Sequence, residues 1–176
     1  RPVEAPREDR RSFRRDLTPA WAANVCLLAG ERPIDLGALD VAYLGGRSSF
    51  TSAVTAATLP GAAVTTWNPR PAVIDEARRL QRAGGLKNLH VITSAGLPAS
   101  LGRRGLDRQD DGFDLVVVDG LFDVVRQTDR EHLVSLIGAV LRPGGLLCVA
   151  YRVAAGWTEV AVVVHLLQAM AALAPG

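Results

Sequence analysis

Val-Ala-Tyr-Leu-Gly-Gly-Arg-Ser-Ser-Phe, residues 41–50, is the stretch of this sequence that decides the fold. The apolar residues predict a buried strand, the glycines a tight turn and the serines the start of a helix. A strand, a glycine turn and a helix in this order form the place where doubly wound α/β proteins bind nucleotides. However, Arg47 and Ser49 stand where such loops usually have glycine, and no carboxylate ends the strand. The stretch therefore predicts the fold together with altered binding chemistry.

Strand and helix patterns alternate on both sides of this stretch. Thr18-Pro19 predicts the start of a helix that ends near Ala29, with Thr18 as its N-cap. Thr128 and Glu131 form a capping box for a helix that ends before Pro143. The predicted strands cover residues 40–44, 62–66, 89–93, 113–118 and 146–151, and the other predicted helices cover 50–58, 70–83 and 158–173. This alternation predicts an α/β fold with a parallel sheet and right-handed crossovers, in which the strand at 113–118 is buried on both faces.

The composition predicts one packed domain. The chain has 176 residues, of which 48% are hydrophobic, which suits a single core. Its net charge of only +2 argues against a dedicated nucleic-acid binder. Residues 1–16 mix arginines with acids, and we expect them to form a charged arm, solvated or loosely helical, before a domain that covers residues 17–176. The alternative is a role of these arginines in contacting phosphate.

The cysteines and the chain ends predict a cytoplasmic protein without a metal. Cys26 and Cys148 lie in apolar runs without metal-ligand spacing, which favours buried reduced thiols. The charged opening lacks the pattern of a signal peptide. The apolar residues 160–174 are fewer than the roughly 20 that span a bilayer. We therefore expect neither a metal nor a membrane to be bound.

Four short motifs occur in a fixed order along the chain. They are Leu17-Thr-Pro-Ala-Trp21, Asn68-Pro69, Leu141-Arg-Pro-Gly-Gly-Leu146 and Tyr151 followed by Gly156-Trp157. By their order and spacing, the chain from Leu17 to Trp157 resembles the class I S-adenosylmethionine-dependent methyltransferases, in particular a bacterial group that shares the Leu-Thr-Pro-Ala-Trp opening. The resemblance implies a Rossmann-like, doubly wound parallel sheet of about five strands in the order 3-2-1-4-5, flanked by helices.

Three acidic side chains bind the cofactor in that family, and none is present here. The acid at the end of the first strand corresponds to Tyr43. The acid that accepts from the ribose hydroxyls corresponds to Thr66, and the acid that accepts from the adenine amino group corresponds to Ala95. Losing the ribose and adenine partners is expected to cost roughly 3–6 kcal/mol of binding free energy. A ligand with a micromolar Kd has only about 8 kcal/mol of binding free energy in total. The substitutions predict that S-adenosylmethionine binding is lost or very weak.

The resemblance also assigns roles to residues that are still present. If the cofactor binds, Gly45, Gly46 and Asn68 would contact it, with Thr66 and Ala95 at the family's binding positions. Asp119 follows the fourth strand, where the family faces its methyl acceptor, and could serve as a general base. The alternative for Asp119 is a turn aspartate bonded to nearby backbone.

Arg47, Ser48 and Ser49 allow two interpretations of their own. Serines at a helix start cap it by accepting hydrogen bonds from free N–H groups. Alternatively, helix amides, hydroxyls and a guanidinium together form a site for phosphate or sulfate.

The end of the chain predicts a subunit interface. Residues 160–174 contain only His165 and Gln168 as polar side chains, and a helix that is apolar all round must be buried on more than one face. The resemblance implies a further β-hairpin after this helix, but the sequence ends at Gly176 before it, so we expect an open sheet edge. We expect a homo- or hetero-oligomer formed through this helix and edge. The alternative is burial beneath the amino-terminal helix and arm of the same chain.

Three functional hypotheses follow. The first is a pseudoenzyme with a degraded S-adenosylmethionine site, a structural or regulatory subunit that acts through a protein partner. The second is an active methyltransferase with a divergent site. The third is a binding module for phosphate or another anion at Arg47, Ser48 and Ser49.

Overall fold

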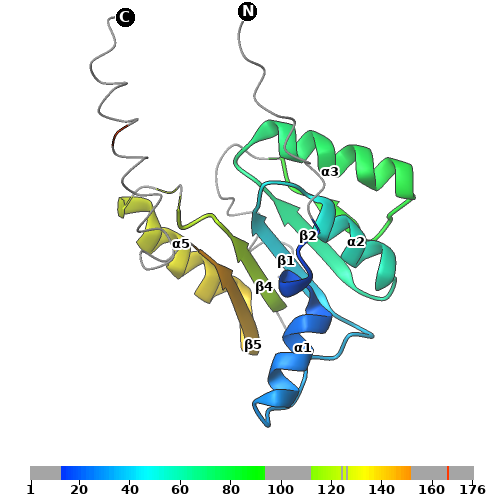
Figure 1. Cartoon of the computed structure of the whole chain (residues 1–176), viewed down its shortest axis with the longest axis vertical. Coiled ribbons are helices and arrows are strands. Elements are labelled where there is room, and N and C mark those ends of the chain that lie inside the picture. Colours follow the sequence, from blue (N-terminus) through cyan, green and yellow to red (C-terminus); the bar gives the residue numbers. More distant parts are fainter. Residues whose placement is uncertain (1–12, 94–111, 124, 126, 152–165, 167–176) are drawn as a thin grey trace, which may run out of the picture.

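Five parallel strands form the centre of the molecule in the computed structural model, which describes residues 13–93, 112–123, 125, 127–151 and 166 (Figure 1). The strands are β1 (Asp40–Gly45), β2 (Ala63–Trp67), β3 (Leu89–Val91), β4 (Phe113–Asp119) and β5 (Leu141–Ala150). Their order is β3-β2-β1-β4-β5, and all neighbours pair in parallel. The predicted α/β fold and strand order are confirmed.

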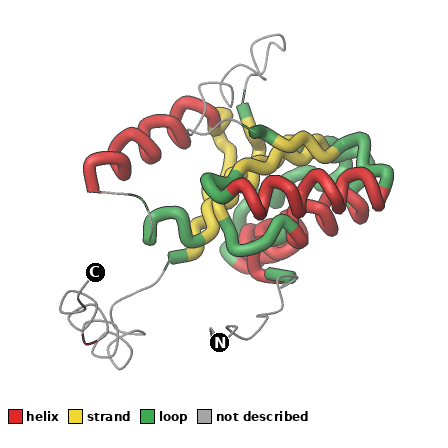
Figure 2. The backbone as a smooth tube through the Cα atoms, turned by 90° about the horizontal axis from the view of Figure 1, so that it is seen from above, coloured by secondary structure: helices red, strands yellow, loops and turns green. Residues whose placement is uncertain are grey.

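Helices cover both faces of the sheet. They are α1 (Pro19–Leu28), α2 (Phe50–Thr58), α3 (Pro71–Gly84) and α5 (Gln127–Val140), with a short 3₁₀ helix η1 (Arg15–Leu17) before α1. Figure 2 shows α5 on one side of the sheet and the other helices on the opposite side. Thr18 caps α1 as predicted, because its side chain accepts from the Trp21 N–H. The structure contains no helix, within the described ranges, that is long and apolar enough to cross a membrane.

Alternating side chains of the central strands build two separate cores. Val41 and Tyr43 of β1 face α2, whereas Ala42 and Leu44 face α5. β4 is buried at every position from Phe113 to Val118, which confirms the prediction of a strand covered on both faces.

A buried aspartate fastens the amino ends of three strands. Asp114 of β4 has a side chain that is only 5% exposed, and it forms an ion pair with Arg142 of β5. Its Oδ2 also accepts from the Asp40 N–H of β1, at 2.7 Å. One carboxylate thereby links the amino ends of these strands, at the edge of the sheet opposite the one where ligands bind.

Several element boundaries differ from the prediction. β5 begins at Leu141 instead of residue 146, because Leu141 pairs with Phe113 before Leu146 pairs with Leu115. The Pro-Gly-Gly turn thus lies inside the strand as an irregularity in register. β2 is shifted by one residue, and β3, an edge strand with a single neighbour, ends at Val91 instead of residue 93.

Other predictions fall partly or wholly outside the described residues. α5 begins at Gln127, one residue before the predicted N-cap Thr128, whose side chain is not described. Ala95 is likewise outside the described part of the chain, and of the helix predicted at 158–173 only Leu166 is described, which is helical. Both cysteines are free thiols, but only Cys26 is buried, whereas Cys148 is half-buried.

Candidate functional site

A cavity of about 690 Å³ opens at the carboxyl ends of β1, β2, β4 and β5. The loops after these strands line it, and Arg14 and Leu17 from the segment before α1 close one side. This edge is where open parallel sheets bind ligands, and the volume lies in the usual range of small-molecule sites, roughly 300–1,000 Å³. The cavity is therefore the candidate binding site.

The glycine turn after β1 forms one wall, and its backbone requires glycine. Gly45 and Gly46 both have φ of 88°, a conformation that other residues rarely adopt. A Cβ on Gly45 would lie 2.7 Å from the main-chain oxygen of Asp119. The Gly46 N–H donates to that same oxygen at 2.8 Å. The turn is thus pressed against the end of β4.

Asn68 holds this turn from the side of β2. Its Nδ2 donates to the carbonyl oxygens of Gly45 and Gly46 at 2.7 and 2.8 Å, and its Oδ1 accepts from the Arg70 N–H at 2.9 Å. The Arg70 guanidinium also donates to the Gly46 carbonyl. The amide of Asn68 is therefore engaged in positioning the loop, a role that its family position alone did not reveal. Its contact with a cofactor stays a prediction.

By the resemblance, Tyr43 corresponds to the family's first acid. It lines the cavity, but its hydroxyl is directed to neighbouring parts of the protein. Its hydroxyl donates to the Leu17 carbonyl at 3.1 Å and shares a hydrogen bond with Thr55 Oγ1 at 2.8 Å. Burial raises the pKa of this phenol. Thr66, at the position of the ribose-binding acid, is buried and lines the cavity.

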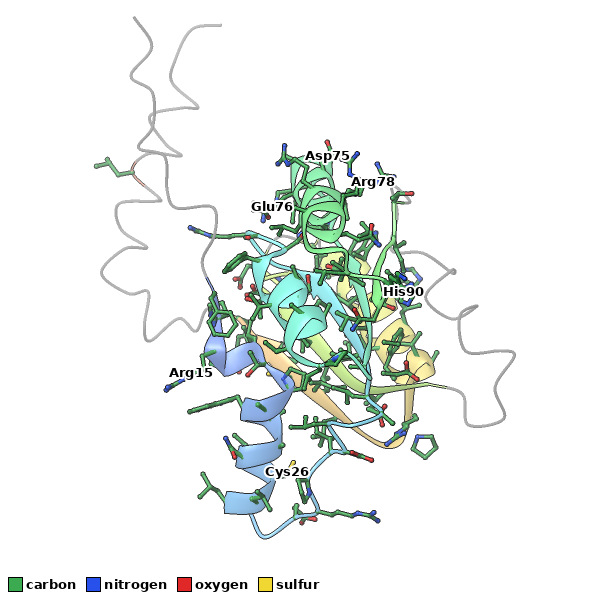
Figure 3. The ribbon with its side chains drawn as sticks, turned by 90° about the vertical axis from the view of Figure 1, so that its right-hand side faces the viewer. Arg15, Cys26, Asp75, Glu76, Arg78 and His90 are labelled. Carbon is green, nitrogen blue, oxygen red and sulfur yellow. The ribbon has the colours of Figure 1, made fainter. Side chains whose placement is uncertain are left out.

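The two serines at the start of α2 behave differently from each other. Ser48 Oγ accepts from the Phe50 N–H at 3.0 Å, as a cap does. The prediction that Ser49 also caps is wrong, because its hydroxyl donates to the Val73 carbonyl at 2.9 Å. The Ser49 N–H donates to Glu76 Oε2 at 2.8 Å, and Figure 3 shows Glu76 on α3. The Ser49 N–H of the predicted anion site is thus already hydrogen-bonded to the carboxylate of Glu76.

Of that predicted anion site, Arg47 and Ser48 line the cavity together. Ser49 instead turns its hydroxyl towards α3, away from the other two. The structure therefore brings two of the three residues to one surface.

Asp119 is the acidic side chain at the end of β4, and it lies among arginines. Its side chain is 26% exposed, and its Oδ1 is 3.6 Å from Arg14 Nη1. Burial raises the pKa of Asp119, and the nearby charges of Arg14, Arg47 and Arg70 lower it by less. The sequence predicts that Arg14 lies in the charged arm. The signals for its place in the cavity are the arginine-rich composition of that arm and the closeness of Arg14 to the Leu-Thr-Pro motif.

No metal centre is built among the residues that the structure describes. They contain no group of three or more histidine, cysteine, aspartate or glutamate side chains that could hold an ion.

Comparison with known sequences gives only a distant match. No family model matches the chain. An uncharacterized protein of Synechocystis is 25% identical over 87 residues, which are 49% of this chain and 16% of that protein. The chain therefore spans less than a fifth of the length of this relative.

Comparison with solved structures is more informative about the fold. PKMT2 from Rickettsia typhi superimposes with a TM-score of 0.69 over 84% of this chain and 28% of its own, at 19% identity. The same protein in complex with AdoHcy gives a TM-score of 0.60 over 74% of this chain and 24% of its own, at 18% identity. Precorrin-6y C5,15-methyltransferase from Geobacter metallireducens covers 88% of this chain and 74% of its own, with a TM-score of 0.54 at 13% identity. Together with the strand order and the glycine turn after β1, these matches show that the chain has the class I methyltransferase fold.

Proposed function

We propose that this protein is a methyltransferase-fold pseudoenzyme, a structural or regulatory subunit that has lost ordinary S-adenosylmethionine binding and acts through a protein partner. The observation that carries the proposal is the environment of Tyr43. Where the family has a carboxylate that supports cofactor binding, the Tyr43 hydroxyl is committed to Leu17 and Thr55 inside the protein. In this proposal, the side chain at position 43 stabilises the protein interior and no longer recognises a ligand.

The charge of the cavity supports the same conclusion. Arg14, Arg47 and Arg70 line it, against the carboxylates of Asp119 and Asp123. S-adenosylmethionine has a sulfonium, an ammonium and one carboxylate, and therefore a net positive charge. Three guanidinium groups outnumber the two carboxylates in this lining, which disfavours a cationic ligand. Thr66 cannot supply the charged acceptor that the ribose hydroxyls would need.

Calorimetric titration tests the loss of the cofactor. We expect neither S-adenosylmethionine nor S-adenosylhomocysteine to bind the purified chain with a Kd in the low micromolar range. The same preparation must unfold cooperatively on heating, so that a silent titration reports on folded protein. Binding of either compound at low micromolar strength would overturn the proposal.

Exposed apolar surface supports the proposed partner. Trp21, Val25 and Leu28 of α1 are 40%, 49% and 89% exposed, and their spacing places them on one face of the helix. On the described sheet, β5 is an outer strand, and its Leu147 is 46% exposed. Together with the apolar residues 160–174, these surfaces favour an oligomer. Light scattering on the full chain should give a mass above that of one chain, and a well-behaved monomer would exclude self-association.

An active methyltransferase with a divergent site is the second candidate. It is favoured by the persistence of the cavity and by Asp119, whose Oδ2 would lie only 3.1 Å from a Cβ placed on Gly46. The carboxylate therefore borders the turn that contacts the cofactor in this fold. AdoHcy is bound in a solved structure of the Rickettsia protein, and SAH in that of coclaurine N-methyltransferase. In this alternative Asp119 would act on the methyl acceptor, and the titration above separates the two candidates.

A further inference from the structure

We infer that the cavity binds a small polyanion, a molecule with two or more phosphate or carboxylate groups, through Arg14, Arg47 and Arg70. The inference rests on the proposed function in one respect, because it assigns a new ligand to the cavity that the cofactor would otherwise occupy. It differs from the anion site predicted at the start of α2, since Ser49 and its amide are engaged with α3.

The first argument is the convergence of the three arginines. They come from three separate segments, namely the residue before η1, the loop after β1 and the residue before α3, and all line one cavity. Guanidinium groups bind phosphate and carboxylate oxygens through paired N–H donors, and they stay charged at any working pH. Since three guanidinium groups line one space of about 690 Å³, a ligand with several anionic groups suits them better than a single small anion.

The second argument is the way in which Arg14 is held. Its Nε and Nη2 donate to the two carboxylate oxygens of Asp16 at 3.0 and 2.7 Å. Asp16 does not line the cavity and fixes the guanidinium from outside. The remaining Nη1 is directed to Asp119, but 3.6 Å separates it from Oδ1, which is longer than a hydrogen bond. The Arg14 guanidinium is thus oriented towards the cavity, and its Nη1 makes only a long contact with Asp119.

The third argument concerns Asp119, which occupies the place of a ligand anion. Arg14, Arg47 and Arg70 attract its charge, whereas Asp16 repels it. Because burial opposes its ionised form, an anion that reaches the arginines from solvent would replace a carboxylate that is unfavourable there. Removing the charge of Asp119 should therefore strengthen polyanion binding.

Calorimetry on the full chain tests the inference, with inorganic pyrophosphate and citrate as probes at matched ionic strength. Pyrophosphate represents phosphate ligands and citrate represents carboxylate ligands. We expect at least one to bind with a Kd below a millimolar. Arg14→Gln should weaken that binding about tenfold, the value of one charge-assisted hydrogen bond. Asp119→Asn should tighten it, and Arg78→Gln, on the exposed side of α3, should leave it unchanged.

The outcomes keep this inference apart from the proposed function. If neither probe binds, or if Arg14→Gln binds as tightly as the unmodified protein, the inference fails. Equal weakening by Arg78→Gln would also overturn it, because the attraction would then be one of general charge. Binding of S-adenosylhomocysteine in a parallel titration judges the proposed function alone.

Discussion

Tyr43 belongs to the core and also lines the cavity, and the environment of its hydroxyl is the observation that carries the proposed function. Tyr43→Phe removes the hydrogen bonds to Leu17 and Thr55 but keeps the ring packed. We expect the free energy of unfolding to fall by about 1–2 kcal/mol, because a buried carbonyl loses its partner. Urea denaturation measures this, with Tyr151→Phe, at an exposed tyrosine, as the control. An unchanged midpoint for Tyr43→Phe would mean that the hydroxyl has no structural role.

Asp119 gives a prediction about pH. Burial raises its pKa above the ordinary value of 3.8, so the folded protein favours the protonated form. Its contribution to stability is therefore present below pH 3.8 and is lost as the pH rises through the raised pKa. Asp119→Asn should be more stable than the unmodified protein at pH 7, and the difference should shrink as the pH falls towards 4. Thermal unfolding between pH 4 and 8 checks this, with Asp75→Asn on the surface of α3 as control. If Asp119→Asn were instead the less stable protein at pH 7, the attraction of the arginines would outweigh burial.

At the scale of elements, the strand-turn-helix of β1 and α2 depends on glycine for a steric reason. Gly45→Ala would place a Cβ against the Asp119 carbonyl in a left-handed backbone conformation. We expect a loss of stability of more than about 2 kcal/mol, since backbone strain and a clash with main chain add together. Gly138→Ala is the matched control, because its Cβ meets nothing within 4 Å inside α5. It should stabilise the protein by about 0.5–1 kcal/mol. Similar denaturation midpoints for the two variants would contradict this account of the turn.

The same turn shows what local sequence can and cannot predict. Its strand, glycines and helix follow from apolar runs and turn chemistry within ten residues, and the structure confirms them. The part played by Asn68 could not be predicted, because its amide contacts carbonyls 22 and 23 residues away. The prediction that Ser49 caps α2 is wrong for the same reason, since the partners of Ser49 lie on α3. Contacts between elements need the register of the sheet, which periodicity does not give.

At the scale of the whole molecule, the strand order could be predicted because regular alternation and the family motifs allow few topologies. The residues that line the cavity could not be predicted in the same way. Arg14 lies in a segment for which the sequence predicts a solvated or loosely helical arm, yet the Arg14 N–H donates to Thr51 Oγ1 at 3.0 Å and its side chain reaches Asp119. Charged residues look alike in sequence whether they are solvated or directed into a site, so only the tertiary structure separates them.

The ion pair between Asp114 and Arg142, at the amino ends of the strands, gives the last prediction. Asp114 links β1, β4 and β5 near their amino ends, and its side chain is buried, whereas that of its partner Arg142 is 43% exposed. Arg142→Ala leaves the Asp114 charge buried with a single backbone N–H, and we expect a loss of about 3 kcal/mol in urea denaturation at pH 7. Arg79→Ala, at an exposed position of α3, should change stability by less than about 0.5 kcal/mol.

A double-mutant cycle separates the charge of Asp114 from the packing of the arginine stem. Asp114→Asn keeps the shape and an acceptor for the Asp40 N–H but removes the buried charge. If the unpaired charge is the cause, Arg142→Ala should cost much less in the Asp114→Asn background than in the unmodified protein. Equal costs in both backgrounds would assign the effect to lost contacts of the arginine side chain. Because this carboxylate links three strands far from the cavity, its loss should lower the free energy of unfolding. The protein that remains folded should bind pyrophosphate or citrate with unchanged affinity.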